Sequence, residues 1–134
     1  MAKTIGLTIA SIAALFALGY FVTTGVVKPV STDLSVIGQG KPVLVLAYEN
    51  FSPTSGEALD SLREVRAEYE PRMQFVVADL GTPQGRAFAD RFGVDDGQTV
   101  FLKPDGQVLL VTRIPSDEQA LRTLLDHKLA ATGS

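Results

Sequence analysis

The feature that most restricts the possible fold is an uncharged stretch of 23 residues, from Ile5 to Val27. Eleven of them are Leu, Ile, Phe or Val, and Lys3 and Lys28 bracket the run. As a helix this stretch would be about 35 Å long, enough to cross a hydrocarbon core of roughly 30 Å with some tilt. We therefore expect residues 1–27 to form one transmembrane helix, retained as a signal-anchor, in front of a folded domain.

A cleaved signal peptide is the alternative, because Ala17-Leu18-Gly19 fits a small-x-small cleavage site. The apolar run continues past that site, which favours a retained helix. The amino terminus and Lys3 on one side nearly balance Lys28 and Lys41 on the other, so the positive-inside rule gives little direction. We expect a single-pass protein of a bacterial inner membrane, with its domain in the periplasm.

Small residues recur along one face of this expected helix. Gly6, Ala10 and Ala14 are spaced four residues apart, and Ala13 and Ala17 lie beside them. Small side chains let a second helix approach closely in lipid. The pattern predicts packing against an integral membrane protein; its alternative is chance, because Gly and Ala are common in membrane helices.

Composition excludes several kinds of chemistry. Beyond Val27 the chain has 11 basic and 15 acidic residues and no polybasic stretch, so we expect no nucleic-acid partner. The sequence has no cysteine, which excludes disulfides, thiolate nucleophiles and Cys-ligated metals, and His127 is its single histidine. We expect no metal and no cofactor, and partners that are proteins.

After an expected linker at residues 28–41, residues 42–130 alternate between strand and helix patterns. Ser52-Pro53 and Thr82-Pro83 are typical helix starts, and Gly93 is a typical helix end. The expected elements, in the order β-α-β-α-β-β-α, are a strand at 42–48, a helix from 53 to near 71, a strand at 73–80, a helix from 83 to 92, strands at 99–103 and 107–113 joined by a turn at 104–106, and a last helix from 116.

Helix periodicity predicts which side chains face the core. In the second helix we expect Ala87, Phe88 and Phe92 to point inward. Ser116, with Gln119 three residues on, fits a capping box that would open the last helix. The inward faces expected for the first and last helices are Leu59, Leu62, Val65 and Tyr69, and Ala120, Leu121, Leu124, Leu125 and Leu129.

This order of elements resembles the thioredoxin core. The likeness includes Lys-Pro-Val-Leu-Val at 41–45, Phe-Gly-Val at 92–94 and Thr-Val-Phe-Leu-Lys-Pro-Asp-Gly at 99–106. It implies a thioredoxin-like α/β sandwich with a mixed sheet, preceded by the transmembrane helix. Such a sheet has its first two strands parallel and a hairpin added antiparallel at one side.

The residues that thioredoxin redox chemistry requires are missing. By the resemblance, Ser52 and Ser55 stand where the family has its two cysteines, Leu46 replaces a buried acid, and Gln98 replaces a cis-proline. A serine cannot form the mixed disulfide of thiol exchange, so this reaction is excluded. Because a cis bond before a residue other than proline costs roughly 2.5–4 kcal/mol, we expect the loop at residues 95–98 to be trans.

Other chemistry has little support in the sequence. Ser52 and Ser55 could be nucleophiles, but His127 lies at the far end of the last helix, and helix capping is the ordinary role of such serines. Glu49, Asp79, Asp95 and Asp96 could suggest a metal site or an acid pair. We interpret Asp95-Asp96-Gly97 instead as a solvated turn.

We therefore expect a protein that is not an enzyme and that serves as a structural or interaction subunit of a membrane complex, with respiratory or photosynthetic assemblies as plausible hosts. An assembly factor or holdase-type chaperone is the alternative. In that case Phe51, Pro53, Asp95 and Asp96 would contact a bound peptide. An enzyme with non-thiol chemistry is a third possibility, for which the sequence offers no set of residues.

Overall fold

A computed structural model of the chain describes residues 29–132. The elements are the short 3-10 helix η1 (Leu34–Val36), β1 (Val43–Tyr48), α2 (Pro53–Tyr69), β2 (Gln74–Asp79), α3 (Pro83–Phe92), β3 (Gln98–Leu102), β4 (Val108–Arg113) and α4 (Glu118–Ala131). From β1 onward their order is the predicted one. The expected transmembrane helix, with Gly6, Ala10, Ala13, Ala14 and Ala17, lies outside the described residues, and within 29–132 no helix is long and apolar enough to cross a membrane.

The four strands form one mixed sheet in the order β2-β1-β3-β4. β1 and β2 are parallel, with Val43 beside Gln74, because α2 carries the chain back between them. β3 runs antiparallel to β1, and β4 runs antiparallel to β3. This confirms the predicted mixed sheet with a hairpin at one side.

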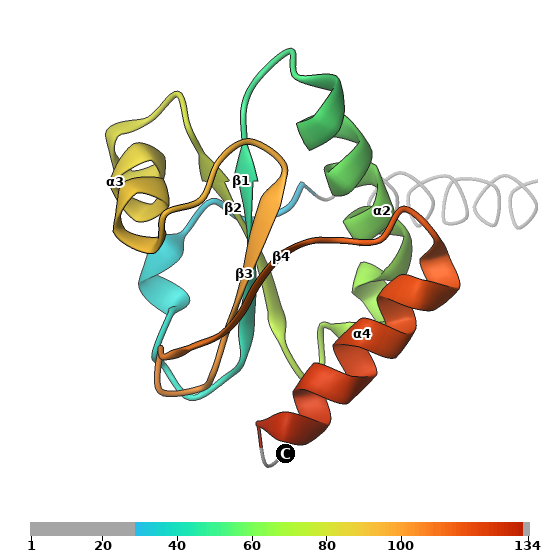
Figure 1. Cartoon of the computed structure of the whole chain (residues 1–134). Helices are drawn as coiled ribbons and strands as arrows, with labels where there is room; N and C mark the ends of the chain where they lie inside the picture. Colours follow the sequence, from blue (N-terminus) through green and yellow to red (C-terminus); the bar gives the residue numbers. More distant parts are fainter. Residues whose placement is uncertain (1–28, 133–134) are drawn as a thin grey trace, which may run out of the picture.

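Helices cover both faces of the sheet, with α2 and α4 on one side and α3 on the other (Figure 1). β1 contributes to both layers, because alternate side chains of a strand point to opposite faces. Leu44 and Leu46 pack in the core beneath α2 and α4, whereas Val43 and Val45 pack with Phe88 of α3. These four side chains are at most 3% exposed. The central strand β1 is therefore packed on both of its faces.

The ends of α3 are formed as predicted. The Thr82 hydroxyl accepts a hydrogen bond from the Gly85 backbone N–H at 3.1 Å, and Gly93 ends the helix in the left-handed conformation. The inward face was only partly predicted. Phe88 is buried and Phe92 partly so, but Ala87 is exposed, because the buried stripe runs through Gly85, Phe88 and Ala89.

The predicted start of α4 is wrong by one residue. Asp117, not Ser116, is the N-cap, and its carboxylate accepts a hydrogen bond from the backbone N–H of Ala120 at 2.8 Å. Ala120 is exposed, contrary to the predicted apolar face, and Leu124 is only partly buried. The helix packs through Leu121, Leu125 and Leu129.

Residues 29–41, the expected linker, lie against the domain. Ser31 forms a parallel bridge to Val76, and its carbonyl accepts a hydrogen bond from the Val77 N–H at 2.8 Å. Leu34 of η1 packs on the core beneath α3. The chain is thus attached to the β2 edge of the sheet from Ser31 onward.

Polar contacts connect α2 to α4. The hydroxyl of Tyr69 donates to the Asp126 carboxylate at 2.8 Å. Burial, followed by this hydrogen bond, raises the pKa of Tyr69 to about 12. Arg122 of α4 binds Glu68 at 2.7 Å and Glu118 at 2.5 Å, and its hydrogen bonds lower the pKa of Glu68. The Tyr69–Asp126 and Glu68–Arg122 contacts join α2 to α4, whereas Glu118 lies on α4 itself.

Candidate functional site

The candidate site lies where β1 ends and α2 begins, the place of the redox motif in the resemblance. Ser52 is the N-cap of α2, and its hydroxyl oxygen accepts a long hydrogen bond of 3.4 Å from the Ser55 backbone N–H. Pro53 is the first residue of the helix, where its missing N–H costs nothing. The predicted capping role of Ser52 is confirmed.

Both serine hydroxyls donate to a single carboxylate. Ser52 binds Oδ2 of Asp96, and Ser55 binds Oδ1 of the same side chain. The Ser55 oxygen also accepts a hydrogen bond from the Glu49 N–H at 3.0 Å, and Ser55 is fully buried. Asp96 therefore links the start of α2 to the loop before β3, and we call Ser52, Ser55 and Asp96 the serine–aspartate clamp.

The loop at residues 95–98 is shaped to bring Asp96 to the two serines. The Gly97 N–H donates to the Ala47 carbonyl at 2.9 Å, next to the end of β1. Gly97 has a φ of 83°, and a Cβ at this position would come within 2.5 Å of the Thr54 side chain. Glycine is thus required here both for the left-handed backbone and for the close approach of α2.

Gln98 stabilises this loop through two hydrogen bonds to Asp95. Its side-chain oxygen accepts a hydrogen bond from the Asp95 N–H at 2.8 Å, and its own N–H donates to the Asp95 carbonyl at 3.0 Å. Arg113 of β4 donates to the Asp96 carbonyl at 3.2 Å. None of the peptide bonds of the described residues is cis, so the expected trans loop is confirmed.

Phe51 projects from the site into solvent. Its side chain is fully exposed, and its φ of 66° lies in the left-handed region that a bulky residue rarely adopts. Pro53 and Asp95 beside it are also exposed. Folding alone gives no reason for an aromatic ring here, because the ring buries no surface against the described residues.

The clamp lacks the arrangement that serine nucleophiles need. Ser55 is inaccessible, and the C-terminal end of α4, which carries His127, lies at the opposite end of the molecule from the start of α2 (Figure 1). A nucleophilic serine requires an adjacent base and access to its substrate. Among residues 29–132 no three His, Cys, Asp or Glu side chains are grouped to hold a metal ion.

The structure thus brings together Ser52, Ser55 and Asp96, places Gln98 in the supporting loop, and leaves Phe51 and Pro53 at the surface. The interpretation of Asp95-Asp96-Gly97 as a solvated turn holds for Asp95 but misses the role of Asp96, which is half-buried. In the sequence, Asp96 is 41 residues from Ser55, and no local pattern connects them.

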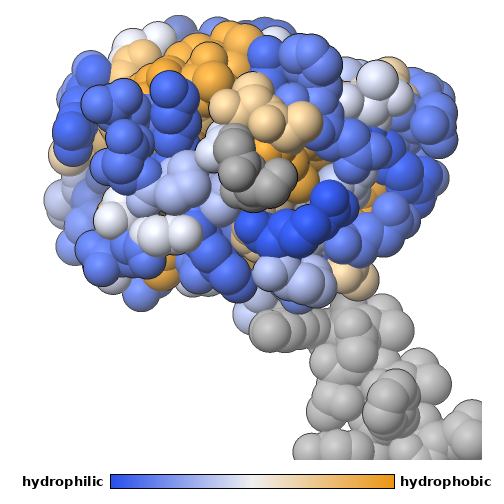
Figure 2. All heavy atoms as spheres, turned by 90° about the horizontal axis from the view of Figure 1, so that it is seen from below, coloured by the Kyte–Doolittle hydropathy of each residue, from blue (hydrophilic) through white to orange (hydrophobic). Residues whose placement is uncertain are grey.

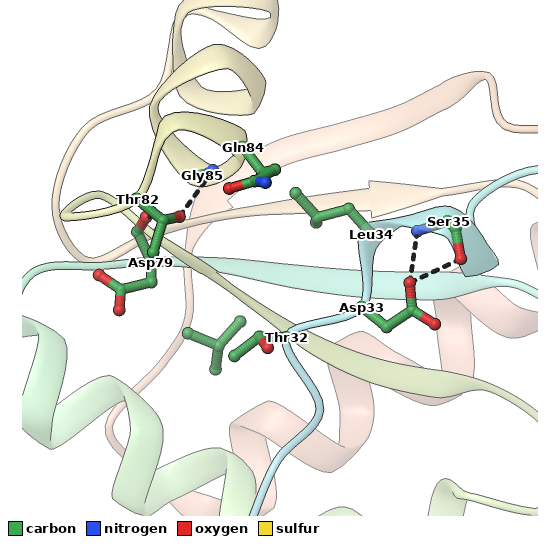
Figure 3. Close-up of a pocket in the computed structure, with 9 residues that line it drawn as sticks. Thr32, Asp33, Leu34, Ser35, Asp79, Thr82, Gln84 and Gly85 are labelled. Carbon is green, nitrogen blue, oxygen red and sulfur yellow. Dashed lines mark hydrogen bonds between the residues drawn. The ribbon is translucent and has the colours of Figure 1, made fainter.

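A second hollow, with a volume of about 510 Å³, lies between the segment around η1 and the start of α3 (Figure 3). Several of its polar groups bond to their own neighbours. Asp33 accepts hydrogen bonds from the backbone and hydroxyl of Ser35, which lower the pKa of Asp33, and Thr82 caps α3. These groups complete local turns, so the hollow suggests no ligand.

Comparison with known proteins supports the fold. No protein-family model and no curated protein matches the sequence. Among solved structures, a thioredoxin from Thermus thermophilus has a TM-score of 0.64 and 19% identity, covering 77% of this chain and 88% of its own. An uncharacterized thioredoxin-like protein from Clostridium perfringens has a TM-score of 0.63 and 21% identity, covering 73% of this chain and 79% of its own. Trxlp from Edwardsiella tarda has a TM-score of 0.61 and 18% identity, covering 72% and 98%.

These likenesses show that the chain has the thioredoxin-like α/β fold. At such low identity they establish the fold alone. What the chain does with that fold depends on its own residues, foremost the serine–aspartate clamp and the exposed Phe51.

Proposed function

We propose that this chain is a redox-inactive, membrane-anchored thioredoxin-like protein that acts as an interaction subunit of a membrane protein complex. The observation that carries this proposal is the clamp. Where the resemblance places two reactive thiols, two serines give their hydroxyl hydrogens to Asp96. Such a site holds its two loops together and has no sulfur for exchange.

The exposed aromatic ring supports a role in protein contact. Phe51 stands next to the clamp, and the clamp fixes the loops on either side of it. Aromatic side chains at a surface bury much area on binding, and they dominate many protein interfaces. In this proposal Phe51, with Pro53 and Asp95 at its rim, contacts the soluble part of a partner.

The membrane part of the proposal comes from the sequence of residues 5–27. Their length and apolarity suit one span, and the face formed by Gly6, Ala10 and Ala14 suits close helix packing. We place the chain in a bacterial inner membrane with its domain in the periplasm. In this proposal the span packs against an integral membrane protein, and the domain contacts a protein partner.

A holdase or assembly factor is the second candidate, favoured by exposed apolar side chains besides Phe51. Val108 and Val111 of the edge strand β4 are about two-fifths exposed. Seen from below, an apolar patch also interrupts the mostly hydrophilic surface (Figure 2). Exposed apolar surface of this kind suits the transient binding of unfolded segments.

Extraction of native membranes with a mild detergent, followed by native separation, tests the proposal. A subunit migrates with a fixed set of proteins, in a constant ratio, after a salt wash. Ala10→Leu should lower the amount of chain retained in this assembly, whereas Ile9→Leu, off the small-residue face, should not. A chain that runs alone and crosslinks to many different proteins would support the holdase instead.

A further inference from the structure

The strand β4 forms an open edge of the sheet. The order β2-β1-β3-β4 leaves two edge strands, and at the first of them Ser31 pairs with Val76 of β2. β4 pairs with β3 alone, and within residues 29–132 no other strand lies beside it (Figure 1). The outer side of β4 therefore presents backbone N–H and C=O groups that an incoming strand can pair with.

β4 lacks the side chains that usually protect such an edge. Natural edge strands discourage pairing with lysines, inward-pointing charges or prolines. β4 reads Val-Leu-Leu-Val-Thr-Arg, so its single charge is at its last residue, Arg113. Val108 and Val111 are 41% and 40% exposed. An apolar and nearly uncharged edge of this kind favours the addition of another strand.

The side chains of β4 are divided symmetrically between the two faces of the sheet. The register with β3 is irregular and leaves Leu109 without a partner. As a result Leu109 and Leu110 both pack on the core beneath α2 and α4. Val108 and Val111 pair with β3 residues whose side chains belong to the core beneath α3. The two valines thus share the α3 face of the sheet, and the two leucines share the other.

The centre of β4 has the same sequence in both directions. Residues 108–111 read Val-Leu-Leu-Val, and polar Gln107 and Thr112 flank them. Consider a second copy that lies antiparallel, with a two-fold axis between Leu109 and Leu110. Valine then opposes valine on one face of the joined sheet, and leucine opposes leucine on the other. A two-fold interface requires such self-complementarity, and apolar cross-strand pairs stabilise a sheet.

The same pairing brings opposite charges near each other. Arg113 would stand opposite Gly106 of the second copy, and the exposed Asp105 directly precedes that glycine. Within residues 29–132 neither Arg113 nor Asp105 forms an ion pair. Arg113 uses one nitrogen to bind the Asp96 carbonyl, which leaves further N–H groups of the guanidinium for a carboxylate. The two-fold axis would repeat this contact at both ends of the paired strands.

We infer that β4 pairs antiparallel with β4 of a second copy of this chain, so that the two sheets join into one. This inference goes beyond the proposed function and does not depend on it. It rests on the open edge, the exposed valines, the palindromic centre of the strand and the placement of Arg113 and Asp105. One pair of strands is smaller than a standard protein interface, so the dimer is reversible and its population rises with concentration.

Cysteine crosslinking tests the register of the pairing, because the chain has no cysteine of its own. Full-length Val108→Cys and Val111→Cys chains are purified in a mild detergent, mixed and gently oxidised. Directly opposite residues of an antiparallel pair are close enough for a disulfide. The mixture should give several-fold more linked dimer than either variant alone at the same total concentration. The exposed Gln119→Cys of α4 is the control and should give little. Equal yields from the mixture and from the single variants would overturn the pairing.

Sedimentation of the full-length chain in detergent measures the oligomeric state. The parent should approach the mass of a dimer as its concentration rises. Val111→Lys should remain a monomer, because it places a charge within the paired edge, and exposure of this position should leave the fold intact. Gln119→Lys adds the same charge on α4 and should dimerise like the parent. Urea unfolding of both variants checks that they are folded.

Two further outcomes would contradict the inference. Ala10→Leu, in the expected transmembrane helix, should leave the dimer unchanged. If Ala10→Leu abolishes the dimer and Val111→Lys does not, the copies associate through that helix and not through β4. If the parent is a monomer at every concentration, β4 does not pair with itself. In that case a loss of Val111→Lys from a native membrane assembly would assign the edge to a different protein.

Discussion

At the scale of single residues, Asp96 accounts for the geometry of the candidate site. One carboxylate receives the hydroxyls of both Ser52 and Ser55, and its own backbone is held by Arg113. Hydrogen bonds to a charged acceptor are stronger than neutral ones, and losing the acceptor leaves the donors of a partly buried site unpaired. The loop before β3 is therefore tied to α2 by side chains as well as by the Gly97 backbone.

Replacement of Asp96 should reveal this role. We expect Asp96→Ala to lower the free energy of unfolding by about 2–3 kcal/mol, because two charge-assisted hydrogen bonds are lost. Asp95→Ala, at the exposed neighbour, should change it by less than about 0.5 kcal/mol. Urea unfolding of the two variants gives the comparison. An effect of Asp96→Ala as small as that expected for Asp95→Ala would mean that the clamp contributes little to stability.

Tyr69 should make stability depend on pH at the alkaline end. Burial and the hydrogen bond to Asp126 raise the pKa of Tyr69 from 10.0 to about 12 in the folded state. The folded state thus keeps the proton that the unfolded state loses. The contribution is complete below pH 10 and disappears as the pH rises to about 12, a loss of roughly 2–3 kcal/mol.

Tyr69→Phe isolates this effect, because phenylalanine keeps the ring and removes the titrating hydroxyl. Below pH 10 the variant should be less stable than the parent by about 1 kcal/mol, since it lacks the hydrogen bond. Between pH 10 and 12 the difference should shrink and then reverse. Parallel stability curves for the two proteins across this interval would contradict the assignment.

At the scale of elements, most of the fold could be predicted because its signals are local. Continuous apolar runs indicate buried strands, and Ser52-Pro53 and Thr82-Pro83 open helices as expected. The start of α4 could not be settled locally, because Ser116 and Asp117 are adjacent and both suit an N-cap. The clamp could not be predicted at all, since Asp96 meets Ser52 and Ser55 only through the sheet.

Substitutions at the start of α4 test whether Asp117 is the N-cap. Asp117→Ala should lower the free energy of unfolding by about 1 kcal/mol, because the N–H of Ala120 loses its acceptor. Ser116→Ala should have an effect below about 0.5 kcal/mol. Thermal or urea unfolding measures both. If Ser116→Ala is the more damaging change, the capping box centred on Ser116 is the correct description after all.

At the scale of the whole molecule, the chain combines a thioredoxin-like domain with a site that has no thiol. Ser31 attaches the start of the described chain to the β2 edge of the sheet. The serine–aspartate clamp occupies the position where the thioredoxin resemblance would place the two redox cysteines. Phe51, which precedes the clamp in the sequence, is fully exposed. We propose that this exposed end of the domain binds a partner protein.

The central claim, that the end of the domain bearing Phe51 binds a partner protein, is tested most directly by photo-crosslinking in intact membranes. A photo-reactive phenylalanine analogue replaces Phe51 in one variant and the exposed Gln119 of α4 in the control. We predict one discrete crosslinked product of constant mass from position 51 and none of that mass from position 119. No product from position 51, or the same products from both positions, would contradict the account.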